Sequence, residues 1–266
     1  MNNATIDLEN FSFSYLEYRE MDPFHLKRHI HPTYEILFVT EGKIDYVIED
    51  KSYALEKGDL LLIRPAQYHF VRDIVAPPYR RFCFHFLPDF TGDDKLIENV
   101  FDRGEMFTLR EGSAAEKLMF LFKELLTQLP QNAREPLCKD MLHAILLSLL
   151  TLKKAPKKNS AVIEKNCWKI LDYINVNLTT INNAEDIANA LFYSKSYINH
   201  LFKNELNISV MQYIRNKRIL LAHKMIGEGA KPTDVFLKCG FSNYVTFYRA
   251  YCQYFGFSPS DNKRKR

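Results

Sequence analysis

The first ninety residues alternate between apolar and polar positions with a period of two, which is typical of β-strands. The alternation is clearest in FSFSY (11–15), YEILFVTEGKIDYVIED (34–50), GDLLLIRP (58–65) and YRRFCFHFL (79–87). Within the second segment, Glu41 and Gly42 interrupt the pattern and predict a hairpin turn. Several short strands at close spacing predict a small barrel or sandwich.

The last of these segments predicts two chemically different faces. Side chains of a strand point alternately to its two sides. One face therefore carries Phe82, Phe84 and Phe86, and the other carries Arg81, Cys83 and His85.

From about residue 113 the apolar residues recur at intervals of three and four, which predicts helices. The first helix carries Leu118, Leu121, Phe122, Leu125, Leu126 and Leu129, and Pro130 should end it. The second carries Leu137, Met141, Leu142, Ile145, Leu146 and Leu149. The two helices have more apolar surface than one small barrel needs to cover itself. The pattern is compatible with a homodimer face and with packing back on the barrel.

A polar, lysine-rich segment, KKAPKKNS at 153–160, predicts a linker, and the chain after it is helical in pattern. We therefore expect an α+β chain of two domains. The expected boundaries are 1–90 for a β-barrel, 91–155 for a helical hairpin as the expected dimerisation element, 156–162 for the linker, and 163–266 for an all-helical domain.

The helical domain begins with a pair of short helices. Asn183 can cap the first, with Asp186 in its first turn, and Ser194 can cap the second. The second helix turns Ile198, Leu201 and Phe202 inward and leaves Ser196, Asn199, His200 and Lys203 outward. Two short helices with a tight turn and a polar outer face are typical of a helix-turn-helix.

The same pattern recurs near the C-terminus. A helix after Thr233 leads into CGFS, where Gly240 can take the left-handed conformation and Ser242 can cap the next helix. That helix turns Phe247 and Tyr251 inward, while Tyr244, Val245, Tyr248 and Arg249 face elsewhere. Between the two motifs, residues 209–226 predict one long helix that holds them at a fixed separation.

Charge is distributed unevenly along the chain. Residues 157–266 hold 17 Lys and Arg against 8 Asp and Glu, whereas the remainder holds 19 against 24. A basic C-terminal part fits a polyanionic partner. A solvated surface of mixed sign is the simpler alternative.

The segment from about 165 to 260 resembles the DNA-binding domain of AraC/XylS-family transcription regulators. The residues that match the family pattern are Gly240, Phe241, Phe247, Tyr251, Gly256 and Pro259. The resemblance implies that the second helix of each motif enters the major groove of double-stranded DNA. Asn207 and Phe236 depart from the family's usual small residues, and the aromatic-Arg pair that usually follows the final Pro is missing.

On matching positions, Ser196, Asn199 and His200 approach the bases in the first motif, and Tyr244, Val245, Tyr248 and Arg249 in the second. Arg249 could bind guanine and Asn199 adenine. Lys203, Arg215, Lys217 and Arg218 are expected as contacts to phosphates or as solvated charges.

The N-terminal part resembles the two short motifs of the cupin barrel. The matching residues are His29, His31, Glu35 and Gly42, followed by Gly58, Pro65 and His69, although Gln67 replaces an expected Gly. In metal-binding cupins the positions of His29, His31, Glu35 and His69 ligate one divalent ion. Regulators of the AraC type often keep such residues as a ligand pocket without metal. We expect a small-molecule effector held by His29, His31, Glu35, Tyr46, Arg64 and His69, with a metal site or satisfied polar residues as the alternatives.

The sequence therefore predicts a transcription regulator rather than an enzyme, without a cofactor. The resemblance implies a carbohydrate or related metabolite as effector, a homodimer, and RNA polymerase as a further partner. The competing hypothesis is a metal-dependent cupin enzyme fused to a DNA-binding module. Five scattered cysteines without a C-x-x-C pair, no signal peptide and no membrane-length apolar run predict a cytoplasmic protein.

Overall fold

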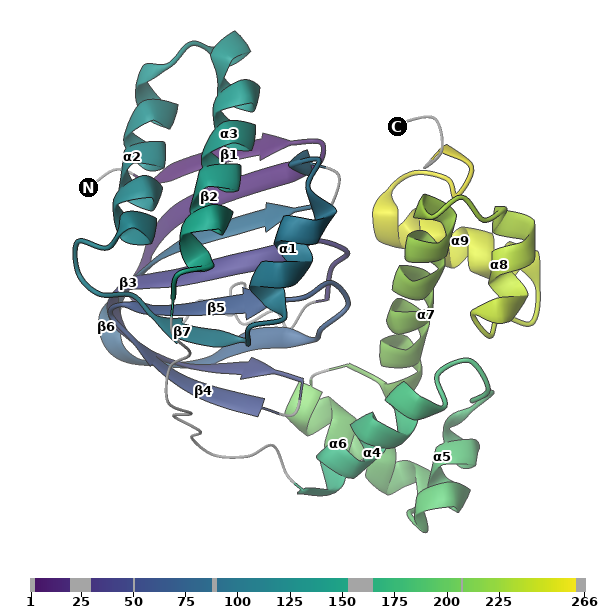
Figure 1. Ribbon diagram of the computed structural model, residues 1–266. Helices are drawn as coiled ribbons and strands as arrows, with labels where there is room; N and C mark the ends of the chain where they lie inside the picture. Colours follow the sequence, from purple (N-terminus) through teal and green to yellow (C-terminus); the bar gives the residue numbers. More distant parts are fainter. Residues whose placement is uncertain are drawn as a thin grey trace. The chain divides into compact units, whose positions relative to one another are not determined.

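The computed structural model describes residues 3–19, 30–49, 51–87, 90–152, 165–206 and 208–261. The chain forms two compact units that divide near residue 162 (Figure 1). Within the described residues the strands all lie in the first unit, and the second is helical, as the pattern of the sequence predicts. The predicted linker at 156–162 lies outside the described residues.

The first unit contains a sheet and three helices. Its strands are β1 (Ala4–Leu8), β2 (Phe11–Tyr18), β3 (Tyr34–Ile48), β4 (Lys51–Glu56), β5 (Asp59–Ile63), β6 (His69–Phe86) and β7 (Met106–Thr108). Its helices are α1 (Asp94–Phe101), α2 (Ala114–Gln128) and α3 (Gln131–Leu149). The strands pair antiparallel in the order β1-β2-β6-β3-β5-β7, and β4 pairs with β3.

Strands β3 and β6 are long and pair with each other along nearly their whole lengths. The predicted turn at Glu41 and Gly42 is wrong, because both residues lie inside β3 at a shift in the register. Gly42 has a φ of 88°, and a Cβ there would lie 2.5 Å from the carbonyl oxygen of Pro78. Glycine therefore allows the two strands to approach at a bulge rather than at a hairpin.

The apolar face of the sheet packs against α1, α2 and α3, which cover it in Figure 1. Phe82, Phe84 and Phe86 are fully buried there, and half of the twelve apolar positions predicted on the two long helices are buried as well. Leu121 is a correction, since it is 44% exposed and Met119 takes the inner position. The hairpin thus packs back on the sheet and leaves Phe120, Leu121 and Leu147 exposed.

The second unit consists of α4 (Lys165–Val176), α5 (Ala184–Leu191), α6 (Lys195–Leu206), α7 (Val210–Gly227), α8 (Pro232–Lys238) and α9 (Tyr244–Phe255). Helix α7 runs between the group of α4, α5 and α6 and the pair of α8 and α9 (Figure 1). The two predicted motifs are therefore α5-α6 and α8-α9. Helix α7 connects them.

Side-chain caps explain where α5, α6 and α9 begin. Asn183 and Asp186 form the reciprocal capping box of α5, and the Ser194 hydroxyl accepts from the Tyr197 N–H at 3.0 Å. In the second motif the predicted cap Ser242 is wrong, because the side chain of Asn243 accepts from the Thr246 N–H at 2.8 Å. Asn and Ser serve equally well at this position, so the sequence alone could not separate them.

Phe236, which departs from the family pattern, is accommodated within the second motif. Its ring lies 5.7 Å from that of Tyr244 and 6.5 Å from that of Phe247. The large side chain at this position is therefore part of the small aromatic core around α9.

Arg218 joins the two motifs, which corrects its predicted role as a phosphate contact or solvated charge. The side chain is only 8% exposed. Its Nε donates to the Leu178 carbonyl at 2.8 Å and its Nη1 to the Gly240 carbonyl at 2.7 Å, while Nη2 donates to the Ile181 carbonyl. The residues around Ile181 lead into α5, whereas Gly240 lies in the turn between α8 and α9. One guanidinium thus binds both motifs from α7.

Replacement of Arg218 by Met should lower the free energy of unfolding of the second unit by about 2–3 kcal/mol, because buried carbonyl oxygens lose their donor. Urea unfolding followed by the fluorescence of Trp168, the only tryptophan, measures this change. Arg215→Met, at an exposed position of the same helix, is the control and should leave the midpoint nearly unchanged. Equal urea midpoints for the two variants would show that the hydrogen bonds of Arg218 contribute nothing to the free energy of unfolding.

We expect the stability of the second unit to depend on pH through His223. Its Nδ1 lies 2.7 Å from the Tyr251 hydroxyl and its ring stacks on Phe255. Burial lowers the pKa of His223 to about 4. Because the unfolded chain takes up this proton near the ordinary value of about 6.5, stability is full above that pH and falls as the pH drops towards 4.

We expect a loss on the order of 2–3 kcal/mol between pH 7 and pH 4 from this group. Urea midpoints across that range test it, with His223→Gln expected to flatten the profile and exposed His200→Gln to leave it unchanged. A wild-type slope that survives in His223→Gln would assign the pH dependence to other groups.

Candidate effector site and nucleic-acid interface

A buried carboxylate lies on the inner face of the curled sheet, opposite the helix-covered face. Glu35 on β3 is 2% exposed, and its Oε2 lies 3.0 Å from the Nε2 of His69 and 3.2 Å from the Nε2 of His85. These two histidines lie near opposite ends of β6. The bend of β3 and β6 therefore brings both rings to one carboxylate.

The neighbours of Glu35 form one connected polar group. The Cys83 thiol donates to Glu35 Oε1 at 3.3 Å, and Nδ1 of His69 lies 2.8 Å from the Gln67 carbonyl oxygen. Burial opposes the charged form of His85, but the negative potential of Cys83 and Glu35 outweighs it and holds the pKa of that imidazole well above its usual range. The group offers acceptors and donors inside an otherwise apolar sheet interior.

The structure brings part of the predicted effector set together. The ligand atoms of His31, Glu35 and His69 lie within 4.8 Å of one another, and the ring of buried Tyr46 stacks on that of His69 at 6.2 Å. Burial is the main reason that the pKa of Tyr46 is raised well above its usual range. His29 lies outside the described residues.

Arg64 does not join this group. Its guanidinium pairs with Asp102 and lies 5.9 Å from the centre of the Phe101 ring, on the side of α1. Cys83 and His85 also belong to the group, although they are not among the residues predicted from the sequence. The alternation of β6 had already placed both opposite the Phe face, so this signal was present.

The same side chains have the chemistry of a transition-metal site. Ligand atoms of Glu35, Cys83 and His85 also lie within 4.8 Å of one another, and imidazole, thiolate and carboxylate suit Zn²⁺ and similar ions. The short contacts from Glu35 to both imidazoles are at hydrogen-bond distance, however. The residues thus fit an ion, and Glu35 also lies at ion-pair distance from both imidazoles.

Arg81 lies on the same inner face, paired with Val39 of β3. Its Nη2 donates to the Tyr18 hydroxyl at 3.3 Å, and its guanidinium carbon lies 5.6 Å from the centre of the Tyr18 ring. The Tyr18 ring in turn stacks on that of Tyr79. A guanidinium keeps its proton even when it is buried, so Arg81 is charged on this face.

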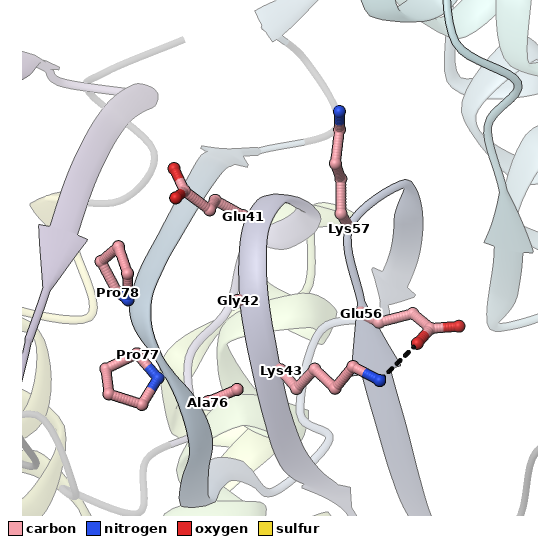
Figure 2. Close-up of a pocket in the computed structure, with 8 residues that line it drawn as sticks. All are labelled: Glu41, Gly42, Lys43, Glu56, Lys57, Ala76, Pro77 and Pro78. Atoms are coloured by element: carbon pink, nitrogen blue, oxygen red, sulfur yellow. Dashed lines mark ion pairs between the residues drawn. The ribbon is translucent and has the colours of Figure 1, made fainter.

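A separate surface hollow of about 360 Å³ lies at the bend of β3 and β6. Figure 2 shows its lining residues, which are Glu41, Gly42, Lys43, Glu56, Lys57, Ala76, Pro77 and Pro78. Each charged group there already has an opposite partner. Lys43 pairs with Glu56, Lys57 with Glu111, and Glu41 with Arg80. The hollow therefore presents no uncompensated charge to a ligand.

In the first helix-turn-helix, α6 separates a buried face from a polar one. Ile198, Leu201 and Phe202 are buried as predicted, whereas Ser196, His200 and Lys203 are exposed and Asn199 is half-buried. His200 Nε2 lies 2.9 Å from the side-chain nitrogen of Asn204, so these two polar groups adjoin on the outer face. The four candidate residues share one accessible side of the helix.

In the second motif, α9 exposes Val245, Tyr248 and Arg249. Tyr244 differs from them, because it is half-buried and its ring packs on those of Phe236 and Phe247. Thr246 and Gln253 are also exposed, at positions three before and four after Arg249, which places them on the same side of the helix. Neither residue is among those predicted from the sequence, although the helical period places both on the side of Arg249.

No helix within the described part of the chain is long and apolar enough to cross a membrane.

Comparison with known proteins agrees with both parts of the structure. Residues 10–146 match the family model of the AraC-like ligand binding domain, and residues 187–265 match that of a helix-turn-helix domain. The chain is 24% identical to the uncharacterized HTH-type transcriptional regulator YdiP of Escherichia coli, over 89% of this chain and 80% of that protein. It is 23% identical to the Msm operon regulatory protein of Streptococcus mutans, over 89% of this chain and 86% of that protein.

Among solved structures, ToxT from Vibrio cholerae is similar with a TM-score of 0.39 and 10% identity, over 96% of this chain and 97% of that one. The matched domains and relatives are those of a transcription regulator and exclude the alternative of a cupin enzyme. The chain belongs to the AraC-type family of transcription regulators, with an N-terminal ligand-binding domain and a C-terminal helix-turn-helix domain.

Proposed function

We propose that this regulator reads DNA with both of its helix-turn-helix motifs, through α6 and α9. The observation that supports this most is the fixed spacing of the two motifs by Arg218 and α7. Two recognition helices held in one compact unit can enter successive major grooves on one side of the duplex. A protein with this partner acts in the cytoplasm, together with the DNA.

The base contacts follow from side-chain chemistry. Arg249 is exposed on α9 and has the planar fork that binds guanine O6 and N7. Asn199 on α6 can bind adenine N6 and N7 in the same bidentate manner. Lys203 and Arg215 are exposed and would contact phosphates, which adds affinity but little sequence preference.

The effector of this proposal is a small molecule on the inner face of the sheet, a carbohydrate or related metabolite. The connected group around Glu35, His69 and His85 supplies donors and acceptors of the kind that bind hydroxyl groups. The effector would act by binding one arrangement of the DNA-binding domain more tightly than another. RNA polymerase would then be a partner of the DNA-bound protein.

Selection of random-sequence DNA by the full-length protein, at two salt concentrations, tests the proposal that both motifs contact the bases. The recovered site should hold two short elements about one helical turn, or 10 base pairs, apart. Arg249→Ala should relax one element and Asn199→Ala the other, each at a cost of about 1–3 kcal/mol for the preferred base. Arg215→Ala should instead weaken binding to all sequences and reduce the salt dependence.

Binding that depends on salt but recovers no sequence would contradict the proposal. A single element lost by both the Asn199 and the Arg249 variants would also contradict it, since it would leave only one motif at the bases.

The same regulator is proposed to act as a homodimer through the exposed apolar residues of the helical hairpin. Phe120 and Leu121 on α2 and Leu147 on α3 are each more than 40% exposed. Leu121→Glu should shift the sedimentation coefficient from dimer to monomer, whereas Val245→Glu in the other unit should not. A wild-type monomer at micromolar concentration, or a dimer that survives Leu121→Glu, would remove this interface.

A further inference from the structure

Polar atoms of two neighbouring side chains on the inner face of the sheet are buried without a hydrogen-bond partner among the residues that the structure describes. They are Nη1 of Arg81 and the hydroxyl oxygen of Tyr79, whose side chain is 1% exposed. Both side chains contact Tyr18. The two unsatisfied atoms therefore belong to side chains that share Tyr18 as a neighbour.

The neighbouring residue on β6, Arg80, differs from Arg81 because its guanidinium has acidic hydrogen-bond partners. Arg80 points to the opposite face, where its Nε donates to Glu17 at 2.8 Å and its Nη1 to Glu41. Within the described part of the chain, Arg81 has no carboxylate at ion-pair distance. The acid on its own face, Glu35, is already bound by His69 and His85. Arg81 is thus a buried cation with one weak neutral acceptor.

Such an arrangement is costly for a protein. A guanidinium cannot escape burial by losing its proton, in contrast to lysine or histidine. A buried charge without a partner carries a desolvation penalty that good pairing would offset. An unsatisfied donor that a fold retains in its interior calls for an explanation, and a bound ligand, ion or water molecule is one.

We propose that the effector carries a carboxylate group, and that Arg81 and Tyr79 bind this group on the inner face of the sheet. The inference rests on the proposed effector function and specifies its chemical class. The planar fork of Arg81 matches the two oxygens of a carboxylate, and the Tyr79 hydroxyl is a further donor to the same anion.

The charge of the site favours a carboxylate over a phosphate. Arg81 is the single cation on this face that has no acidic partner in the described residues, so it balances one negative charge. A phosphate ester with two charges would leave one uncompensated in a buried place. The rest of the ligand would face the Glu35, His69 and His85 group, so an acidic carbohydrate satisfies both halves of the site.

Acetate tests this inference without knowledge of the natural effector, and acetamide is its neutral counterpart of nearly the same shape. The full-length protein is heated in acetate, acetamide or chloride at constant ionic strength. At roughly ten times its dissociation constant, acetate should raise the melting temperature of the sensor unit by about 3 °C, and acetamide should not. Arg81→Met should abolish the acetate response, while the matched variant Arg80→Met should retain it.

Tyr79→Phe is a second test variant, because it removes the hydroxyl group and should keep the aromatic ring and the fold. It should weaken acetate binding at least threefold, because one donor to the carboxylate is lost. Equal shifts with acetate and acetamide, an acetate response that persists in Arg81→Met, or unchanged affinity in Tyr79→Phe would each overturn the inference.

Binding of the same samples to the selected DNA site separates this inference from the proposed function. If the acetate response is absent while sequence-specific DNA binding is intact, only the carboxylate assignment fails. If sequence-specific binding is absent while acetate acts through Arg81, the proposed DNA reading fails and the anion site stands.

Discussion

The hydrogen bonds of Arg218 fix the geometry on which the DNA-binding unit depends. Each helix-turn-helix motif is small and has a core of only a few aromatic and aliphatic side chains. A long helix alone would hold the motifs at a set distance but leave their rotation open to small changes in packing. Arg218 removes this freedom because it binds the carbonyl groups of Leu178, Ile181 and Gly240 at once. The guanidinium thus holds separate segments of this unit together through hydrogen bonds to backbone carbonyls, as the hydrogen bonds between strands do in a sheet.

The sensor unit depends on a comparable constraint, the long pairing of β3 with β6. The bulge at Gly42 lets both strands bend, and the bend brings His69 and His85 to the same carboxylate. The outer face is filled with phenylalanine rings and covered by helices, so it contributes stability. The inner face keeps its charged and polar groups. One strand therefore separates the residues that hold the fold from those that can bind a ligand.

Local patterns in the sequence predicted the class of fold and the faces of its elements, because the periods of two and of three to four depend only on neighbouring residues. Gly42 and Arg218 were misjudged for a shared reason. The glycine is required by the approach of Pro78, and the arginine by carbonyl groups around 40 and 22 residues away. Cys83 and His85 were missed because their association with Glu35 depends on strand register. Local patterns can assign a residue to a face, as alternation does for Cys83 and His85, but they do not determine which distant groups that residue contacts in the folded chain.

Under the carboxylate proposal, the dipeptide of Arg80 and Arg81 serves both stability and recognition. They are chemically identical neighbours, yet alternation sends one to acidic partners and the other into the interior. If burial of a charge were only a defect, selection for stability would favour an apolar residue at position 81, since apolar replacement of buried ions is often neutral or stabilising. In a sensor, a buried arginine at position 81 has an advantage over an apolar residue. A cation left incomplete in the free protein makes ligand binding depend on the negative charge of the ligand, and part of the interaction energy is then available to shift the DNA-binding state.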